Sequence, residues 1–241
     1  MSKIIVLNVS GNVGKTTVAA HLLYPRLLVD GVDPVLVEVE TYNKSADGLP
    51  GITSIKKTGA QYREVYEMGF NSGNMIVDVG ASNIVPFFQQ LRSLDGSGHI
   101  FDLFVIPTTS GTKEMLDTLK TIELLRTFGV EEDRLRVVFN RVGENLISEF
   151  RMLYDASALP QTKFDFNKKL SIRETELFKD LGELGETVAS MLADDANYSK
   201  LAMEAKDPAE KKGYIRRDMA RRMSATVNRN LDSVFTALEV K

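Results

Sequence analysis

The most informative segment of the chain is Ser10-Gly11-Asn12-Val13-Gly14-Lys15-Thr16-Thr17, which lies between a β-branched run, Lys3–Val9, and a helix-like segment, Thr16–Tyr24. Glycines at such a junction let backbone N–H groups turn inward around a phosphate, and the amino end of the helix adds its positive dipole. Lys15 would reach the β- and γ-phosphates of a nucleotide, and the Thr16 hydroxyl would bind Mg²⁺. The segment therefore predicts a phosphate-binding loop, against the alternative of a glycine turn with an incidental lysine.

Outward from this loop, short apolar runs alternate with helix-like segments through the first two-thirds of the chain. Four further runs are strand-like: Val35–Glu40, Met75–Val79, Phe101–Pro107 and Leu135–Asn140. The helix-like segments between them include Gln61–Met68, Ile84–Leu94 and Thr112–Phe128. This alternation predicts βαβ units, a mostly parallel sheet and a three-layer α/β/α fold around the phosphate loop.

The last third of the sequence is mostly helix-like. Gln161–Asp165 is a weak strand candidate, and Ser171–Glu174 fits a capping box that would open a short helix. We also predict helices over Glu183–Ala193 and Ile215–Leu238. In the second of these, apolar residues recur every three or four positions and form one stripe.

Pro208 and Gly213 mark the upstream boundary of that last helix. The change in pattern predicts two parts of the chain. Residues 1–170 would form a P-loop nucleotide-binding domain, and residues 171–241 a helical C-terminal extension with a basic amphipathic helix.

Three carboxylates fall at the ends of predicted strands. Glu38 and Glu40 are two positions apart and point to the same face, and Asp78 ends the run Met75–Val79. The carboxyl ends of parallel strands form the crevice where such sheets bind ligands, and phosphoryl transfer needs acidic groups there to hold Mg²⁺ and orient water. The alternatives are a helix N-cap for Asp78 and a solvated strand-end carboxylate for Glu40.

The composition is that of a globular protein of 241 residues, 43% hydrophobic and 26% charged. Cysteine is absent, which excludes disulfides, Cys-ligated zinc, iron–sulfur clusters and a thiol nucleophile. Only two histidines occur; we expect His21 to pack on its helix and His99 to face solvent. No apolar run approaches the ~18 residues of a membrane span, and the N-terminus lacks a signal-peptide pattern, so we expect a cytoplasmic location.

The net charge of −3 is unevenly distributed. The stretch from Lys200 to Asn230 contains nine basic and four acidic residues, so it carries +5 and the remainder carries −8. Basic side chains beside an apolar stripe can contact DNA phosphates or anionic lipid, while the alternative is a solvated face that meets acidic groups of the same protein. The residues expected to make such contacts are Lys212, Arg216, Arg217, Arg221 and Arg222.

The phosphate loop resembles a motif of the ParA/MinD family of deviant Walker ATPases. Gly11–Thr17 is similar to the family's GGVGKTT, with Asn12 in place of the second glycine. Asp78-Val79-Gly80 falls where the family has its Walker B aspartate, and Glu38 where it has the aspartate that positions the attacking water. Val105–Thr109 resembles the strand and loop that follow Walker B.

Val137–Arg141 resembles the family's strand whose terminal asparagine, here Asn140, recognises adenine, since an amide offers both the donor and the acceptor that this base requires. The resemblance covers about residues 1–142 and implies a P-loop NTPase of the SIMIBI type that binds ATP and Mg²⁺. The implied catalytic residues are Lys15, Glu38 and Asp78; the implied metal-binding residues are Thr16 directly and Asp78 and Glu38 through water; the implied nucleotide-binding residues are Gly11, Asn12, Val13, Gly14, Lys15, Thr16, Thr17, Asn140 and Arg141.

Within this family, Asn8–Thr17, Asp78–Asn83 and Val137–Asn140 look most like plasmid stability proteins of the StbB type and the related conjugal transfer protein TraL. The resemblance implies a nucleotide-gated switch in plasmid stability, partition or conjugation, a homodimer that forms on ATP binding, and a plasmid DNA-binding partner protein. Ser10 stands where the family has a signature lysine, which implies slow or partner-stimulated hydrolysis. Lys113 is either a replacement for that lysine or an ordinary surface residue.

Two other functions stay open at this point. One is a small-molecule kinase or ligase of the same superfamily, similar to dethiobiotin synthetase, which would need an acceptor pocket. The other is a nucleotide-binding scaffold without turnover.

Overall fold

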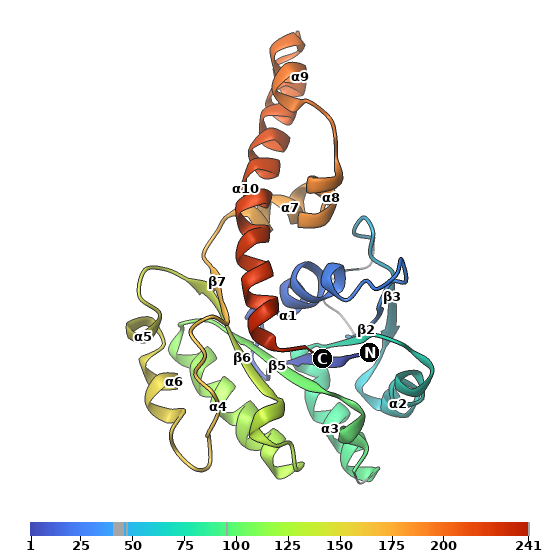
Figure 1. The fold of residues 1–241 in the computed structure, drawn as a ribbon, viewed down its shortest axis with the longest axis vertical. Helices are drawn as coiled ribbons and strands as arrows, with labels where there is room; N and C mark the ends of the chain where they lie inside the picture. Colours follow the sequence, from blue (N-terminus) through green and yellow to red (C-terminus); the bar gives the residue numbers. More distant parts are fainter. Residues whose placement is uncertain (41–45, 47, 95, 241) are drawn as a thin grey trace.

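The computed structural model describes residues 1–40, 46, 48–94 and 96–240. Within them, a seven-stranded sheet has the order β3-β2-β4-β1-β5-β6-β7, and every pair of neighbouring strands is parallel (Figure 1). The strands are β1 (Lys3–Leu7), β2 (Val35–Val39), β3 (Ser54–Lys57), β4 (Met75–Val79), β5 (Leu103–Thr108), β6 (Leu135–Val142) and β7 (Ser171–Arg173).

Helices follow most of the strands. The α-helices are α1 (Lys15–Thr17), α2 (Tyr62–Asn71), α3 (Ile84–Ser93), α4 (Thr112–Thr127), α5 (Leu146–Glu149), α6 (Arg151–Ala156), α7 (Leu177–Leu184), α8 (Val188–Ala193), α9 (Tyr198–Glu204) and α10 (Pro208–Leu238). A π-helical segment, η1 (Val18–Leu23), continues α1, and the short 3₁₀ turns are η2 (Tyr24–Arg26), η3 (Gly59–Gln61), η4 (Ala81–Asn83), η5 (Ser97–Ile100) and η6 (Glu132–Arg134).

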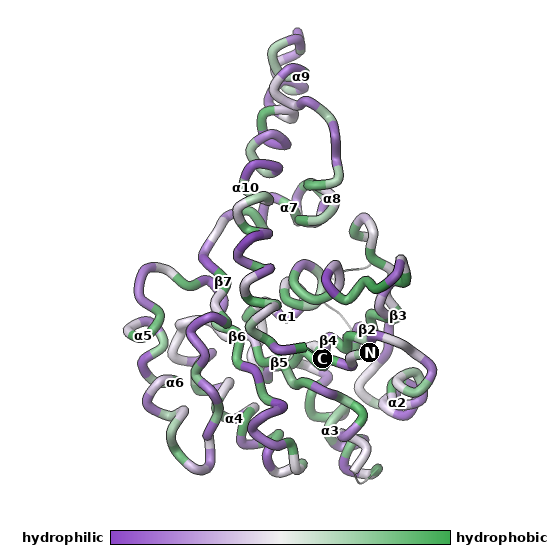
Figure 2. The backbone as a smooth tube through the Cα atoms, in the orientation of Figure 1, coloured by the Kyte–Doolittle hydropathy of each residue, from purple (hydrophilic) through white to green (hydrophobic). Residues whose placement is uncertain are grey.

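The two faces of the sheet carry separate hydrophobic cores. On β1, Ile5 packs on the face covered by α2, α3 and α4, while Ile4 packs on the face covered by η1, α7, α8 and α10. Because successive side chains of a strand point to opposite faces, a strand covered on both sides must be apolar throughout. Figure 2 shows the central strands as hydrophobic runs. The structure therefore confirms the predicted three-layer α/β/α fold with a parallel sheet.

The strand and helix predictions differ from the structure mainly in the last third. Ser171–Arg173 is not the start of a helix: it is β7, which pairs with β6 at the edge of the sheet. Gln161–Asp165 is not a strand, and no regular element forms there. The helix predicted over Glu183–Ala193 is interrupted, because Gly185 adopts a left-handed conformation (φ 66°) that ends α7 before α8 begins.

Helix α10 is longer than predicted. It begins at Pro208 and passes through Gly213, since the Asp207 side chain accepts hydrogen bonds from the N–H groups of Ala209 and Glu210 and caps the helix. The division of the chain after residue 170 stays a prediction, although β7 adds the first residues of the proposed extension to the sheet.

The lower part of α10 packs against the sheet layers, where Leu231, Val234 and Leu238 are fully buried. Its upper part extends away from the sheet with α9 beside it (Figure 1). We call residues 198–222 the arm. Among the described residues, no helix is long and apolar enough to cross a membrane.

Candidate phosphate-binding site

The loop between β1 and α1 contains left-handed backbone conformations that its residue types can adopt. Gly14 has φ 94°, and Asn12 has φ 58°. Asparagine is one of the few residues with a side chain that tolerates the left-handed region, so Asn12 can stand where the family motif has glycine. A Cβ on Gly14 would lie 2.1 Å from Nδ2 of Asn140, and this amide donates a hydrogen bond to the Val13 carbonyl at 3.0 Å. Asn140 therefore holds the loop from the end of β6.

Lys15 is buried at the start of α1 with its ammonium turned toward the loop. Its Nζ donates to the carbonyl oxygens of Asn8 (3.1 Å) and Ser10 (2.6 Å). Burial lowers the pKa of Lys15, and the nearby carboxylates of Asp78 and Glu40 oppose that shift. The loop therefore contains a cation that contacts neutral carbonyl groups, an arrangement suited to an incoming anion.

Asp78 lies opposite Thr16 at the end of β4. The Thr16 hydroxyl donates to Oδ2 of Asp78 at 2.7 Å, and Oδ1 of Asp78 is buried with no hydrogen-bond partner among the described residues. Burial raises the pKa of Asp78 to about 6, against the Thr16 hydrogen bond and the Lys15 charge, which lower it. A buried carboxylate oxygen without a donor, next to a hydroxyl, is suited to a hard cation such as Mg²⁺.

No group of three or more His, Asp or Glu side chains forms a metal-binding cluster in the part of the chain that the structure describes. Proteins usually hold Mg²⁺ through one or two side chains together with phosphate oxygens and water. The Thr16–Asp78 pair fits such a role.

Glu38 lies in β2 and Glu40 directly follows its last residue, and the two carboxylates make different contacts. Glu38 accepts hydrogen bonds from the Ala46 N–H and from the Ser54 hydroxyl (2.9 Å), so it joins the end of β2 to β3. The Ser82 hydroxyl donates to Glu40 at 3.3 Å, and a Cβ on Gly80 would lie 1.9 Å from Oε2 of Glu40. Gly80 therefore leaves room for the Glu40 carboxylate beside the segment after β4.

These groups surround a cavity of about 640 Å³. The predicted residues Gly11, Asn12, Gly14, Lys15, Thr16, Thr17, Glu38, Asp78 and Arg141 line it, and so does Glu40. The prediction missed Ala20, His21, Leu49, Gly80, Ala81 and Phe178. The Asp78-Val79-Gly80-Ala81 run could have indicated Gly80 and Ala81, but no sequence signal connects Phe178 with the loop.

Two predicted nucleotide-binding residues, Val13 and Asn140, do not line the cavity. The Asn140 amide contacts protein backbone at both ends, since its Oδ1 accepts from the Arg141 N–H at 2.9 Å. Its contact with adenine stays a prediction, and the structure adds a clear role in holding the loop.

Lys113, at the start of α4, reaches the first residue of the loop. Its Nζ donates to Ser10 Oγ at 3.4 Å and to Asp117 at 2.9 Å. The Lys113 side chain remains 73% exposed. A cation therefore approaches the side of the loop where the family has its signature lysine, although it comes from another element.

The two histidines lie as expected. His21 is buried on η1, and burial lowers its pKa to about 4, whereas His99 is exposed in η5. His99 borders a larger cavity of about 800 Å³ between α3 and the amino ends of β5 and β6. Among the described residues, neither a phosphate loop nor a carboxylate lines that cavity, so the smaller cavity is the candidate phosphate site.

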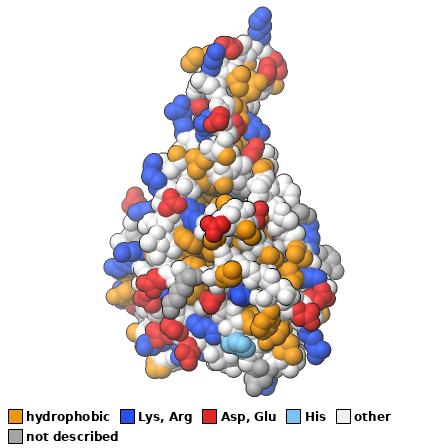
Figure 3. Space-filling view, turned by 45° about the vertical axis from the view of Figure 1, so that its right-hand side comes forward, with side chains coloured by type: hydrophobic (Ala, Val, Ile, Leu, Met, Phe, Trp, Pro, Cys, Tyr) orange, Lys and Arg blue, Asp and Glu red, His pale blue; other side chains and the backbone are white. Residues whose placement is uncertain are grey.

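The basic residues near the arm are mostly paired. Arg216 contacts Asp180 and Glu183, Arg217 contacts Glu186, and Arg222 contacts Asp218. Arg221 donates to the Ala196 carbonyl at 2.7 Å, and Lys212 is exposed. Figure 3 shows basic, acidic and hydrophobic side chains mixed along the projecting arm on the face it displays.

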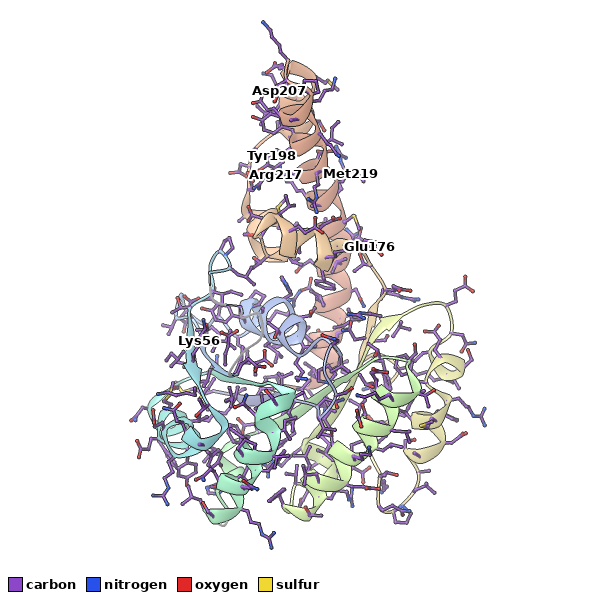
Figure 4. All side chains as sticks on the ribbon, turned by 180° about the vertical axis from the view of Figure 1, so that it is seen from behind. Lys56, Glu176, Tyr198, Asp207, Arg217 and Met219 are labelled. Carbon is purple, nitrogen blue, oxygen red and sulfur yellow. The ribbon has the colours of Figure 1, made fainter. Side chains whose placement is uncertain are left out.

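The paired arginines connect the arm to its surroundings. Arg217 also lies 5.9 Å from the ring of Tyr198 on α9, and Figure 4 shows Met219 on the other side of α10. The sequence left two alternatives for the basic residues. Arg216 and Arg217 fit the second one, a solvated face that meets acidic groups of the same protein.

Comparison with family models finds no match, and no curated protein matches the sequence. Solved structures do match. A variant of the Cyanothece protein McdA in complex with ATP is 15% identical over 100% of this chain and 97% of its own, with a TM-score of 0.54. The MinC:MinD cell division complex of Aquifex aeolicus is 17% identical over 93% and 96%, with a TM-score of 0.53.

A Borrelia burgdorferi protein described as a plasmid partition protein, bound to AMPPNP, is 13% identical over 92% of this chain and 98% of its own, with a TM-score of 0.50. This chain therefore has the fold of ParA/MinD-type P-loop ATPases.

Proposed function

We propose that this chain binds Mg-ATP and acts as a ParA-like, nucleotide-gated switch with slow or partner-stimulated hydrolysis. The observation that carries the proposal is a single cavity that holds both a buried ammonium, Lys15, and a buried carboxylate oxygen of Asp78 without a partner among the described residues. Bound ATP and Mg²⁺ would give each of them an oppositely charged neighbour.

Each predicted site residue has a place in this proposal. Lys15 binds the β- and γ-phosphates, and the Gly11–Thr17 backbone surrounds them. Thr16 binds Mg²⁺ directly, while Asp78 and Glu38 hold it through water. Arg141 and Asn140 are assigned to the nucleotide by resemblance, and Arg141 lines the cavity.

The switch would act through the two carboxylates at the carboxyl end of β2. Glu38 is bonded to Ala46, and Glu40 is bonded to Ser82, so each acidic group joins a strand end to a following segment. A γ-phosphate that displaces or recruits these carboxylates would bias the segments between two arrangements.

Ser10 brings no positive charge to the phosphates, which is why we propose slow hydrolysis. Lys113, 3.4 Å from the Ser10 hydroxyl, is a candidate to supply part of that charge.

We assign the phosphate- and metal-binding part of the site to residues 1–170 and partner contacts to the helical extension, residues 171–241. The proposed role is in plasmid stability, partition or conjugation in the cytoplasm, with an ATP-dependent homodimer and a plasmid DNA-binding partner protein; it rests on the sequence resemblance. A neighbour in fold described as a plasmid partition protein supports the same direction. Contact with DNA or anionic lipid would involve Lys212 and Arg221. Arg216, Arg217 and Arg222 would join them if a phosphate group replaced the carboxylate that each of them contacts.

The nucleotide site can be tested by isothermal titration of the full chain with ATP and Mg²⁺. We expect saturable binding that Lys15→Ala abolishes. Lys120→Ala is the matched control, because that lysine lies on the surface of α4 with a side chain 68% exposed. Equal ATP affinity in the wild type and Lys15→Ala would refute the site.

The switch can be tested by light scattering with ATP, ADP and no nucleotide. We expect a dimer only with ATP. In a separate experiment in cells, we expect plasmid retention to be lost when Lys15→Ala replaces the wild type. A monomer under all three conditions would refute the dimer, and normal retention would refute the plasmid role.

A further inference from the structure

The cavity is lined by two chemically different groups of residues. One group is the phosphate loop with Lys15 and Asp78. The other group is Ala20, Leu49 and Phe178, with His21 in contact with the Phe178 ring, and is largely apolar. A nucleotide has the same two-part chemistry, since a charged phosphate chain is joined to a flat base with an apolar face.

Phe178 comes to this cavity from the distant α7. The neighbouring residues Leu177 and Leu181 are fully buried in the core and fix the orientation of the helix, while Phe178 is only partly buried. Its ring lies 5.3 Å from the ring of His21, with 44° between the planes. Two aromatic rings from segments far apart in the sequence therefore form one wall of the cavity.

His21 contributes a neutral ring to this wall. It is buried on η1, its Nδ1 accepts a weak hydrogen bond from the Val188 N–H at 3.4 Å, and burial lowers its pKa to about 4. At neutral pH it therefore carries no charge, and the wall remains an uncharged aromatic surface. Such a surface suits a base, because every base has a π face that stacks on an aromatic ring.

We propose that Phe178 is the residue on which the base of the bound nucleotide stacks, with His21 supporting the ring from η1. This inference rests on the proposed nucleotide-binding function and adds the base-binding part of the site. The cavity of about 640 Å³ lies within the usual range for sites of small molecules and cofactors. Stacking on Phe178 does not require the Asn140 amide to release its backbone contacts.

The position of Phe178 also joins the base to the arm. Asp180 lies two residues further along α7 and pairs with Arg216 of α10 at 3.0 Å, as Glu183 does from the next turn. A base stacked on Phe178 would therefore contact the same helix that holds the lower end of the arm.

The test compares ATP with inorganic tripolyphosphate, which has the phosphates and no base. We would titrate both ligands, with Mg²⁺, into the wild type, Phe178→Ala, Phe178→Tyr and Phe70→Ala. Phe70 is a matched control because it is an aromatic residue on α2, 65% exposed and outside the cavity. Thermal unfolding of each variant reports whether the chain is folded.

We expect Phe178→Ala to weaken ATP binding roughly 10-fold, the scale of one base–aromatic stack, and to leave tripolyphosphate binding unchanged. Phe178→Tyr, which keeps the ring, should bind ATP within about twofold of the wild type, and Phe70→Ala should match the wild type for both ligands.

ATP affinity of a folded Phe178→Ala variant within twofold of the wild type would overturn the proposal. An equal loss for ATP and tripolyphosphate would also overturn it, because Phe178 would then support the loop rather than the base. Failure of the proposed function gives a different result, in which the wild type binds neither ligand or Lys15→Ala binds both normally.

Discussion

The phosphate loop and the arm both concentrate charge, but they do so in opposite ways. At the loop, Lys15 and Asp78 are buried, and one Asp78 oxygen has no partner among the described residues. In the arm, Arg216, Arg217 and Arg222 each contact a carboxylate near the surface. Surface pairs contribute little to stability, whereas a buried charge is costly unless it is compensated. The loop rather than the arm therefore indicates a ligand.

Among changes to the backbone and packing of these two regions, we expect the largest effect at Gly14. In Gly14→Ala, the new Cβ would meet the Asn140 amide at 2.1 Å, and the residue would have to keep φ 94°. We expect ATP affinity to fall about 100- to 1,000-fold, because left-handed strain and displacement of Asn140 act on the same loop. Isothermal titration measures the loss. A variant that binds ATP normally would show that the loop does not need this backbone.

The second prediction compares the two halves of α10. Leu231 is fully buried against the sheet layers, while Met219 of the arm is 58% exposed. We expect Leu231→Ala to lower the free energy of unfolding by about 3 kcal/mol, as a large-to-small change in a core does. Met219→Ala should change it by less than about 0.5 kcal/mol. Urea unfolding measures the free energy of unfolding of both variants. Equal losses would contradict the distinction between the buried lower part of α10 and the exposed arm.

The third prediction concerns the loss of folding stability at acidic pH. Burial lowers the pKa of His21 to about 4 from its ordinary 6.5, so the unfolded chain takes up a proton in this range before the folded chain does. The contribution of His21 to stability should therefore be complete above pH 6.5 and be lost as the pH drops toward 4, by about 3 kcal/mol in total, whereas Asp78, whose pKa burial raises to about 6, contributes with the opposite sign.

In His21→Gln this part of the pH dependence should disappear. His99→Gln should keep it, because His99 is exposed. Urea unfolding between about pH 4 and 7 measures the difference, and parallel curves for His21→Gln and the wild type would contradict the assignment.

The smallest expected effect is at the arm's own glycine. Gly213 lies inside α10, and a Cβ there meets nothing within 4 Å. Gly213→Ala should raise the free energy of unfolding by about 0.5–1 kcal/mol, because alanine loses less backbone entropy in a helix. It should leave ATP affinity unchanged, in contrast to Gly14→Ala. Weaker ATP binding would show that the arm and the loop are coupled more tightly than their separation suggests.

Much of the fold could be predicted from the sequence, because buried parallel strands are apolar throughout and the phosphate loop joins the first of them to a helix. The run Met75–Val79 coincides with β4. The edge strands could not be predicted in this way. β3 is Ser-Ile-Lys-Lys and β7 is Ser-Ile-Arg, and both owe their conformation to pairing with β2 and β6 rather than to their own pattern.

The residues of the site also divide into some that the sequence pattern could predict and some that it could not. Lys15, Thr16 and Asp78 could be predicted because each stands at a junction of strand and helix that the sequence marks. Phe178 could not, because its place in the cavity depends on how α7 packs, and a phenylalanine directly after a leucine has the pattern of an ordinary core residue. The pairing of Arg216 with α7 also needed the tertiary structure.

The contact between η2 and the end of α10 affects the order in which the chain can fold during synthesis. Arg26 bonds to Asp232 and to Asn228, about 200 residues later, and Arg136 bonds to the Leu238 carbonyl. One face of the sheet is therefore covered both by an early segment and by α10, the last helix of the described residues. In a growing chain, Ile4, Val6 and their neighbours on this face therefore stay without their α10 cover until that helix has been synthesised.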